Sequence, residues 1–259
     1  RFNVIGTRKL SKWNPSTGWS APVATRSIVW AFCDVFRSAY GGKLADEFLD
    51  LDNLYELDQF YEGRNEHFDW IFDQKITVWD AAKTIARVGR AIPMLNGSRI
   101  TMVRDEPKTL PVAVFNQENI IKDSLRWDIK LFEVNEKDSV EIEYTDPISW
   151  NPEEVLCILP ESEGLDPEKI KLAGCTDRDH AYHEGMYIAA SNYYVRENIS
   201  FQTGLEGHIP TYGDLISVSH DLPRWGQAGF VYSINGQFVE LSDPVEFGVG
   251  TNYIVFRKK

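Results

Sequence analysis

The segment from residue 174 to residue 214 constrains the fold more than any other part of the chain, because helix and strand signals follow one another within it. Thr176 is followed three residues later by Asp179, a pattern typical of a helix N-terminus. The helix is expected to continue to about Arg196, roughly 30 Å at 1.5 Å per residue. Apolar strands at 199–203 and 215–219 follow, separated by a turn that contains Glu206, Gly207 and Gly213. The sequence therefore predicts one long helix inserted among strands.

The first part of the chain predicts a small unit of helices and one hairpin. Apolar residues at helical spacing favour a helix at 27–38, and a second, partly acidic helix is expected within 45–61. Thr77 followed by Asp80 indicates the start of a third helix, which closes near Gly89. The pair Asn96-Gly97 then joins two apolar runs and favours a type I′ hairpin, because both turn residues need positive φ. We predict a leading segment from a preceding domain at 1–26 and a small α+β domain at 27–105.

The remainder of the chain favours short strands. Val140, Ile142 and Tyr144 alternate with glutamates, which is typical of a strand with one buried face. Further strands are expected at 131–134, 230–234, 237–241 and 253–256, and Asn235-Gly236 predicts a second hairpin. The predicted fold class is α+β: a small helix-plus-hairpin unit followed by a mainly antiparallel, β-barrel-like domain at 106–259, with the long helix inserted at about 176–196.

Charge and composition exclude several classes of function. The 39 Asp and Glu residues outnumber the 27 Lys and Arg residues and give a net charge of −12, so stable nucleic-acid binding is not expected. Apolar runs are shorter than the ~20 residues of a membrane-spanning helix, and the polar opening has no signal-peptide core. Three scattered cysteines favour reduced thiols over a disulfide framework. Because the chain begins at Arg1, we expect it to be an excised part of something longer.

One group of residues has metal-ligating chemistry. Cys175, His180 and His183 follow the spacing C-x4-H-x2-H, which places the two histidines one helical turn apart. A structural zinc site needs a fourth ligand, and Glu184 is expected to point elsewhere on the helical wheel. The preferred interpretation is a buried cysteine with helix-surface histidines. No metal site and no cofactor are predicted, and these three residues remain the candidates.

Signals for catalysis or sugar binding are weak. Paired carboxylates are plentiful in so acidic a chain and favour a solvated face over a catalytic pair. The G-x-S-x-G and phosphate-loop motifs are absent. Trp30, Trp70 and Trp79 lie in apolar patterns that favour core packing. Trp19, Trp150 and Trp225 lie near proline or glycine and are the candidates for an exposed interface.

Several motifs occur in an order that resembles a known family. They begin with the aromatic-containing helix at 28–35 and include the segments 68–72 and 79–92 and the Asn96-Gly97 hairpin. The most similar part opens at Gly174-Cys175-Thr176 and continues through Ala181, His183, Gly185, residues 186–188, Phe201, Gly204, Glu206, Gly207 and residues 213–218. Over about 27–235 the chain resembles the central region of the tip attachment protein J family of lambda-like tailed phages, also called host specificity or central tail fibre proteins. Tyr212 departs from the proline common there.

The resemblance implies a structural tail hub and no enzyme. Its expected place is the tip of the virion tail, after assembly in the bacterial host cytoplasm, as a homotrimer that supports host attachment and closes the tail tube. Expected partners are distal tail or tube proteins and the tape measure, and an isolated fragment can be monomeric. Acidic side chains would then repel DNA from the walls of a tail channel. The alternatives are a cell-wall or polysaccharide hydrolase domain and a carbohydrate-binding module.

Overall fold

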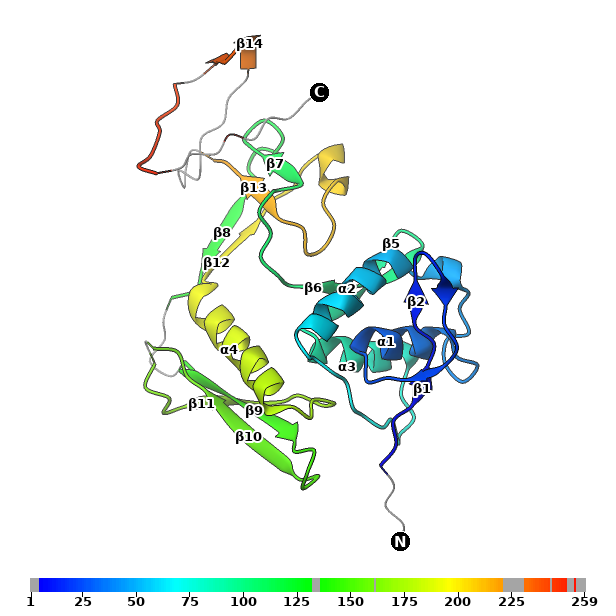
Figure 1. Ribbon diagram of the computed structural model, residues 1–259. Coiled ribbons are helices and arrows are strands. Elements are labelled where there is room, and N and C mark those ends of the chain that lie inside the picture. Colours follow the sequence, from blue (N-terminus) through cyan, green and yellow to red (C-terminus); the bar gives the residue numbers. More distant parts are fainter. Residues whose placement is uncertain are drawn as a thin grey trace. The chain divides into compact units, whose positions relative to one another are not determined.

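The computed structural model describes residues 5–131, 136–160, 162–220, 231–242, 244–250 and 254 (Figure 1). Contacts divide the chain into two compact units. Unit 1 comprises residues 1–105 and 130–196, and unit 2 comprises residues 106–129 and 197–259. Every helix among the described residues is too short or too polar to span a lipid bilayer.

The N-terminal half of unit 1 consists of helices, short strand pairs and one hairpin. Its helices are α1 (Ile28–Arg37), the 3₁₀ turn η1 (Asp46–Phe48), α2 (Leu51–Gly63) and α3 (Val78–Val88). Its strands are β1 (Lys9–Leu10), β2 (Trp13–Asn14), β3 (Gly18–Trp19), β4 (Val23–Ala24), β5 (Ala91–Asn96) and β6 (Arg99–Arg104). All pair antiparallel, β1 with β4, β2 with β3 and β5 with β6.

Local capping signals explain where α1 and α3 begin. The side chain of Ser27 accepts a hydrogen bond from the backbone N–H of Trp30, and that of Thr77 accepts one from Asp80. These contacts satisfy N–H groups that have no partner within the helix. The helices predicted at 27–38 and 77–89 are therefore confirmed, and so is the hairpin turning at Asn96 and Gly97.

The predicted second helix is interrupted. Leu49 is extended, with φ −113° and ψ 138°, and forms an isolated parallel bridge with Ile100. The backbone N–H of Asp50 donates to the carbonyl of Ile100 at 3.0 Å. A sheet hydrogen bond thus replaces a helical one at this point, so the segment is divided into η1 and α2.

The second half of unit 1 is a three-stranded sheet with the long helix against it. Strand β9 (Ser139–Thr145) lies between β10 (Pro152–Cys157), which is antiparallel to it, and β11 (Pro167–Lys171), which is parallel. Val140, Ile142 and Tyr144 are buried, as their alternation predicted. Helix α4 (Arg178–Tyr194) contacts β9 and β10 and lies over them in Figure 1. The long inserted helix is therefore confirmed.

The residue that caps α4 differs from the prediction. Asp177 is the N-cap, and its carboxylate accepts from the backbone N–H of His180 at 2.8 Å. The hydroxyl of Thr176 instead donates to Asp69 and accepts from Arg26 at 3.0 Å. The prediction that Thr176 caps the helix is wrong by one residue, because these tertiary contacts engage its hydroxyl.

Replacing Asp177 with alanine is expected to lower the free energy of unfolding by about 1 kcal/mol, because a helix N–H loses its acceptor. Urea denaturation followed by circular dichroism measures the loss. The matched control is Asp179→Ala in the first helical turn, where only a favourable interaction with the helix dipole of about 0.5 kcal/mol is at stake. A larger loss for the Asp179 variant would contradict the assignment of the cap.

Unit 2 is built from separate strand pairs. Strand β7 (Ala113–Phe115) pairs parallel with β13 (Ile216–Val218), and β8 (Arg126–Ile129) pairs antiparallel with β12 (Glu197–Ser200). The second Asn-Gly hairpin is confirmed as β14 (Val231–Asn235) with β15 (Phe238–Leu241). The turn predicted near Gly207 contains the 3₁₀ turn η2 (Leu205–His208).

The structure corrects the barrel-like part of the predicted fold. The chain mixes helices and strands as expected, but in the described ranges its sheets have two or three strands and none closes into a barrel. Contacts also group residues 130–196 with the N-terminal half, because α4 bonds to that half through His180 and Glu184. The predicted strands at 131–134 and 253–256 fall largely outside the described residues.

Candidate functional site

The three predicted metal-ligand candidates lie in different environments. Cys175 is buried, its thiol donates to the carbonyl of Asp177 at 3.3 Å, and burial raises its pKa to about 12. His180 is also buried, and its Nε2 lies 2.8 Å from the carbonyl oxygen of Val88. His183 is exposed. Within the described chain, the cluster of candidate ligand atoms lying within 4.8 Å of one another is instead Glu66, His180 and Glu184.

Glu66 and Glu184 belong to a buried ion-pair network. Arg90 donates to both carboxylate oxygens of Glu184, at 2.8 and 3.1 Å. Arg104 donates to Glu66 at 3.1 Å and lies 4.0 Å from Glu184, while Arg64 binds the other oxygen of Glu66. Both glutamates and Arg104 are at most 6% exposed. We call these five residues the ion-pair network; it joins α4 to β6 and to the ends of α2 and α3.

The charges of the ion-pair network favour a structural role over metal binding. Each carboxylate oxygen already has an arginine nitrogen as its partner, so a divalent cation would compete with three guanidinium groups. Arg104 is held further by donation to the carbonyl of Gly89 at 2.7 Å, and Arg90 lies 3.9 Å over the ring of Tyr187. The arrangement can fix α4 in place, and a metal centre is not proposed there.

The expectation that Glu184 points away from the histidines is wrong. His180 and Glu184 are four residues apart, so they share the buried face of α4, whereas His183 lies on the exposed face. The i, i+4 spacing of His180 and Glu184 could have indicated that both side chains lie on the same face of the helix. Nothing local indicated the pairing of Arg104 with Glu66, because the two residues are 38 positions apart in sequence.

The candidate interface tryptophans differ in exposure. Trp19 is half-buried: its Nε1 donates to Asp46 at 2.7 Å, Arg37 lies 3.6 Å over its ring, and Trp30 packs edge-on at 5.7 Å. Trp150 is 49% exposed. Trp225 lies outside the described residues. An interface role for these three stays a prediction.

Core packing was predicted for three other tryptophans and holds for one. Trp30 is 1% exposed, but Trp70 is 43% exposed and Trp79 is 36% exposed. Trp70 lies in a segment without regular structure. Trp79 is in the first turn of α3, where its ring centroid lies 6.1 Å from that of Phe36. An apolar sequence neighbourhood was therefore insufficient to predict burial.

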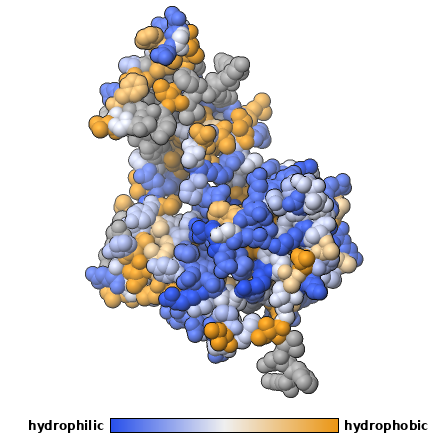
Figure 2. All heavy atoms as spheres, viewed as in Figure 1, coloured by the Kyte–Doolittle hydropathy of each residue, from blue (hydrophilic) through white to orange (hydrophobic). Residues whose placement is uncertain are grey.

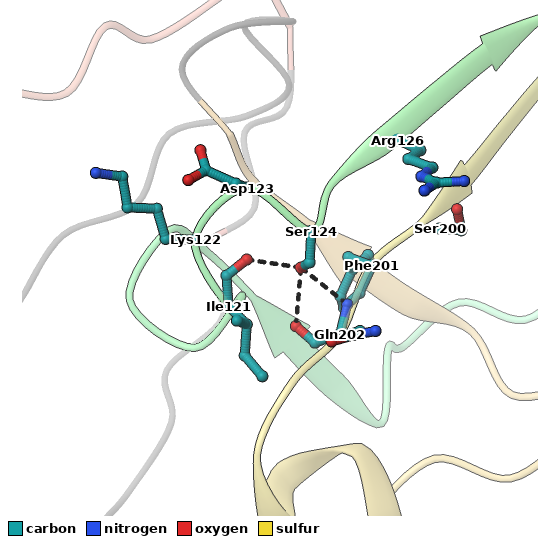
Figure 3. A pocket seen from close by; sticks show the side chains of 8 residues that line it. All are labelled: Ile121, Lys122, Asp123, Ser124, Arg126, Ser200, Phe201 and Gln202. Atoms are coloured by element: carbon teal, nitrogen blue, oxygen red, sulfur yellow. Dashed lines mark hydrogen bonds between the residues drawn. The ribbon is translucent and has the colours of Figure 1, made fainter.

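A pocket of about 530 Å³ lies in unit 2 beside residues 121–126 and 200–202 (Figure 3). The hydroxyl of Ser124 donates to the carbonyl of Ile121 at 2.6 Å and accepts from the backbone N–H of Gln202 at 3.0 Å. The hydroxyl proton is thus directed to the main chain and not to a base. Lys122 and Arg126 lie on opposite sides of Ser124 in Figure 3, so their charges do not converge on one point. These contacts connect two chain segments and offer no activated nucleophile.

A smaller pocket, of about 230 Å³, lies in unit 1 between the β2–β3 hairpin and α2. The rings of Trp13 and Tyr55 lie in its wall with centroids 6.2 Å apart and planes at 78°. Asp58 also lines it and is 2% exposed. Burial raises the pKa of this carboxyl, although hydrogen bonds from Ser27 and Trp30 oppose the change. A carboxylate and two aromatic rings therefore share one concave site.

Unit 2 has little core of its own in the part that the structure describes. Of its described residues, Phe115 and Ile120 are the hydrophobic ones with buried side chains. Leu205, Phe238, Tyr232 and Ile234 are instead 86%, 81%, 70% and 66% exposed. Figure 2 shows orange, apolar side chains on the surface of this unit. Exposed apolar surface of this kind is typical of proteins that associate with a partner.

Comparisons with known proteins find sequence similarity to a phage tail-tip protein. No family model matches it. A tip attachment protein J from Escherichia phage SECphi27 is 24% identical over 181 residues, which cover 67% of this chain and 14% of that protein. The crystal structure of the tail protein from Neisseria meningitidis MC58 is similar at 15% identity with a TM-score of 0.44, over 64% of this chain and 52% of that one. The chain thus spans about one seventh of the curated relative.

Proposed function

We propose that the chain is a structural component of the tip or baseplate hub of a phage or prophage tail. The observation that carries this proposal is the sequence similarity to a phage tip attachment protein over 67% of the chain. The exposed apolar side chains of unit 2 support an assembly role, because association with neighbouring tail proteins would remove them from water. The proposed partners are distal tail, tube and tape-measure proteins, and the proposed state in the virion is a homotrimer.

The proposed role is non-enzymatic. Asp58 and Glu62 share the pocket of unit 1, but both oxygens of Asp58 accept hydrogen bonds, from Ser27 and Trp30, and Glu62 is paired with Lys12. The serine of the larger pocket is bonded to main-chain groups. These contacts favour binding and structure over acid–base chemistry. Zymography against bacterial cell wall should accordingly give no clearing.

Antibodies raised against this chain test the proposal on intact particles. Applied to phage particles released by the strain that encodes the protein, they are expected to label the distal end of the tail in electron micrographs. Antibodies against the major capsid protein of the same particles are the control and should label only the head. Labelling of the head would contradict a tail-tip location. So would a lack of labelling, even after mild dissociation, on particles that the control antibody recognises.

A further inference from the structure

The pocket of unit 1 contains the buried carboxylate of Asp58, which forms no ion pair with any cationic side chain that the structure describes. The Oδ2 of Asp58 accepts from the indole N–H of Trp30 at 2.7 Å, and Oδ1 accepts from the hydroxyl of Ser27. Both donors are neutral. Buried charges in proteins are normally paired, because an isolated charge is costly to remove from water. When ionised, Asp58 therefore adds to the pocket lining a negative charge that is not neutralised by a direct ion pair with a described residue.

The other charged residues of the pocket do not neutralise the charge of Asp58. Lys12 lines the pocket, but its ammonium group forms an ion pair with Glu62, which also lines it. The described lining thus carries two carboxylates against one ammonium group, so its formal charge is −1 when all three are ionised. One positive charge placed in the pocket would make it neutral.

The aromatic walls favour a particular kind of positive charge. The planes of the Trp13 and Tyr55 rings are inclined at 78° in an edge-to-face pair, and both residues line the pocket, so the two rings form a corner of its wall. The faces of Trp and Tyr rings attract ammonium and guanidinium groups, most strongly where water is partly excluded. Hydrated metal ions gain less from such walls than organic cations, whose apolar carbons also contact the rings. The volume, about 230 Å³, suits one side-chain head group and its stem and is smaller than a typical drug-sized pocket.

We propose that this pocket binds an organic cation, a guanidinium or ammonium group, in the corner between Trp13 and Tyr55 and near Asp58. The group can come from an arginine or lysine side chain of a partner protein or from a free polyamine. The site is independent of the tail assignment, since it rests on the geometry of unit 1 alone. It is also distinct from the ion-pair network, in which the described carboxylates already have arginine partners.

NMR titration of the full chain tests the proposal, with the indole N–H signals of Trp13 and Trp30 as reporters. Nα-acetyl-arginine methylamide is expected to shift both signals saturably, and the citrulline derivative, of the same shape but neutral, is expected to bind about tenfold more weakly. Spermidine forms the second arm: tighter binding of spermidine assigns the pocket to free polyamines, and tighter binding of the arginine derivative assigns it to a protein side chain. Equal binding of the citrulline derivative, or no shift by either cation at about 10 mM, would overturn the proposal.

A pair of variants separates charge from pocket damage. Lys12→Gln and Glu62→Gln each remove one partner of the same exposed ion pair, so they disturb the wall similarly. The first changes the lining charge from −1 to −2 and should strengthen cation binding several-fold, whereas the second changes it to 0 and should weaken binding several-fold. Glu56→Gln, at an exposed position of α2 outside the lining, should leave binding unchanged. Shifts of the same sign in the Lys12 and Glu62 variants would also overturn the proposal.

Discussion

Replacing Glu184 with alanine is expected to lower the free energy of unfolding of unit 1 by about 3–5 kcal/mol, the cost of breaking a buried ion pair by removing one partner. Arg90 donates to this carboxylate twice, and Arg104 lies 4.0 Å from it. The side chain of Arg90 is 18% exposed, so without Glu184 its largely buried charge would lose the carboxylate that compensates it. Urea denaturation followed by tryptophan fluorescence measures the loss.

The control for this variant is Glu56→Ala. Glu56 is exposed on α2, and no described residue forms an ion pair with it. Its replacement should change the free energy of unfolding by about 0.5 kcal/mol or less. A loss at Glu184 no larger than the loss at Glu56 would show that the ion-pair network contributes little to the attachment of α4.

The same network shows which interactions the sequence could not predict. Its contacts join residues as far apart as Arg90 and Glu184, which are separated by 94 positions. Helix starts at Ser27 and Thr77 and the turn at Asn96 depend on neighbours within three residues, so they could be predicted. Long-range ion pairs depend on how separate elements pack, and a single sequence contains no local signal for that.

The β-rich part of the chain shows a second limit. Period-two alternation correctly predicted which residues of β9 are buried, since alternate side chains lie on opposite faces of a strand. Alternation does not specify the neighbour of a strand. Here β9 has an antiparallel neighbour on one side and a parallel one on the other, and β7 pairs in parallel with β13 about 100 residues later. The expectation of a barrel rested on many short strands with turn signals between them, a pattern that does not specify how the strands pair, and no sheet in the described part closes into a barrel.

The second large expected effect on stability comes from the close contact between α4 and the sheet on which it packs. Gly185 lies on the buried face of α4, and a Cβ atom added there would lie 2.4 Å from Cys157 Sγ and 2.8 Å from Ile142 Cγ1. Both neighbours are fully buried, so neither can move freely to make room. Gly185→Ala is therefore expected to lower the free energy of unfolding by about 1–3 kcal/mol, the usual cost of overpacking a core.

A second helical glycine serves as the control, because its replacement by alanine is expected to raise the free energy of unfolding instead of lowering it. Gly63 lies in the last turn of α2, and an added Cβ there would meet no atom within 4 Å. Gly63→Ala should raise the free energy of unfolding by about 0.5–1 kcal/mol, since alanine loses less backbone entropy on entering a helix. Both variants have the same chemistry, so the difference between them isolates the close approach of α4 to β9 and β10. Equal stabilisation by the two alanines would mean that α4 does not pack on the sheet at Gly185.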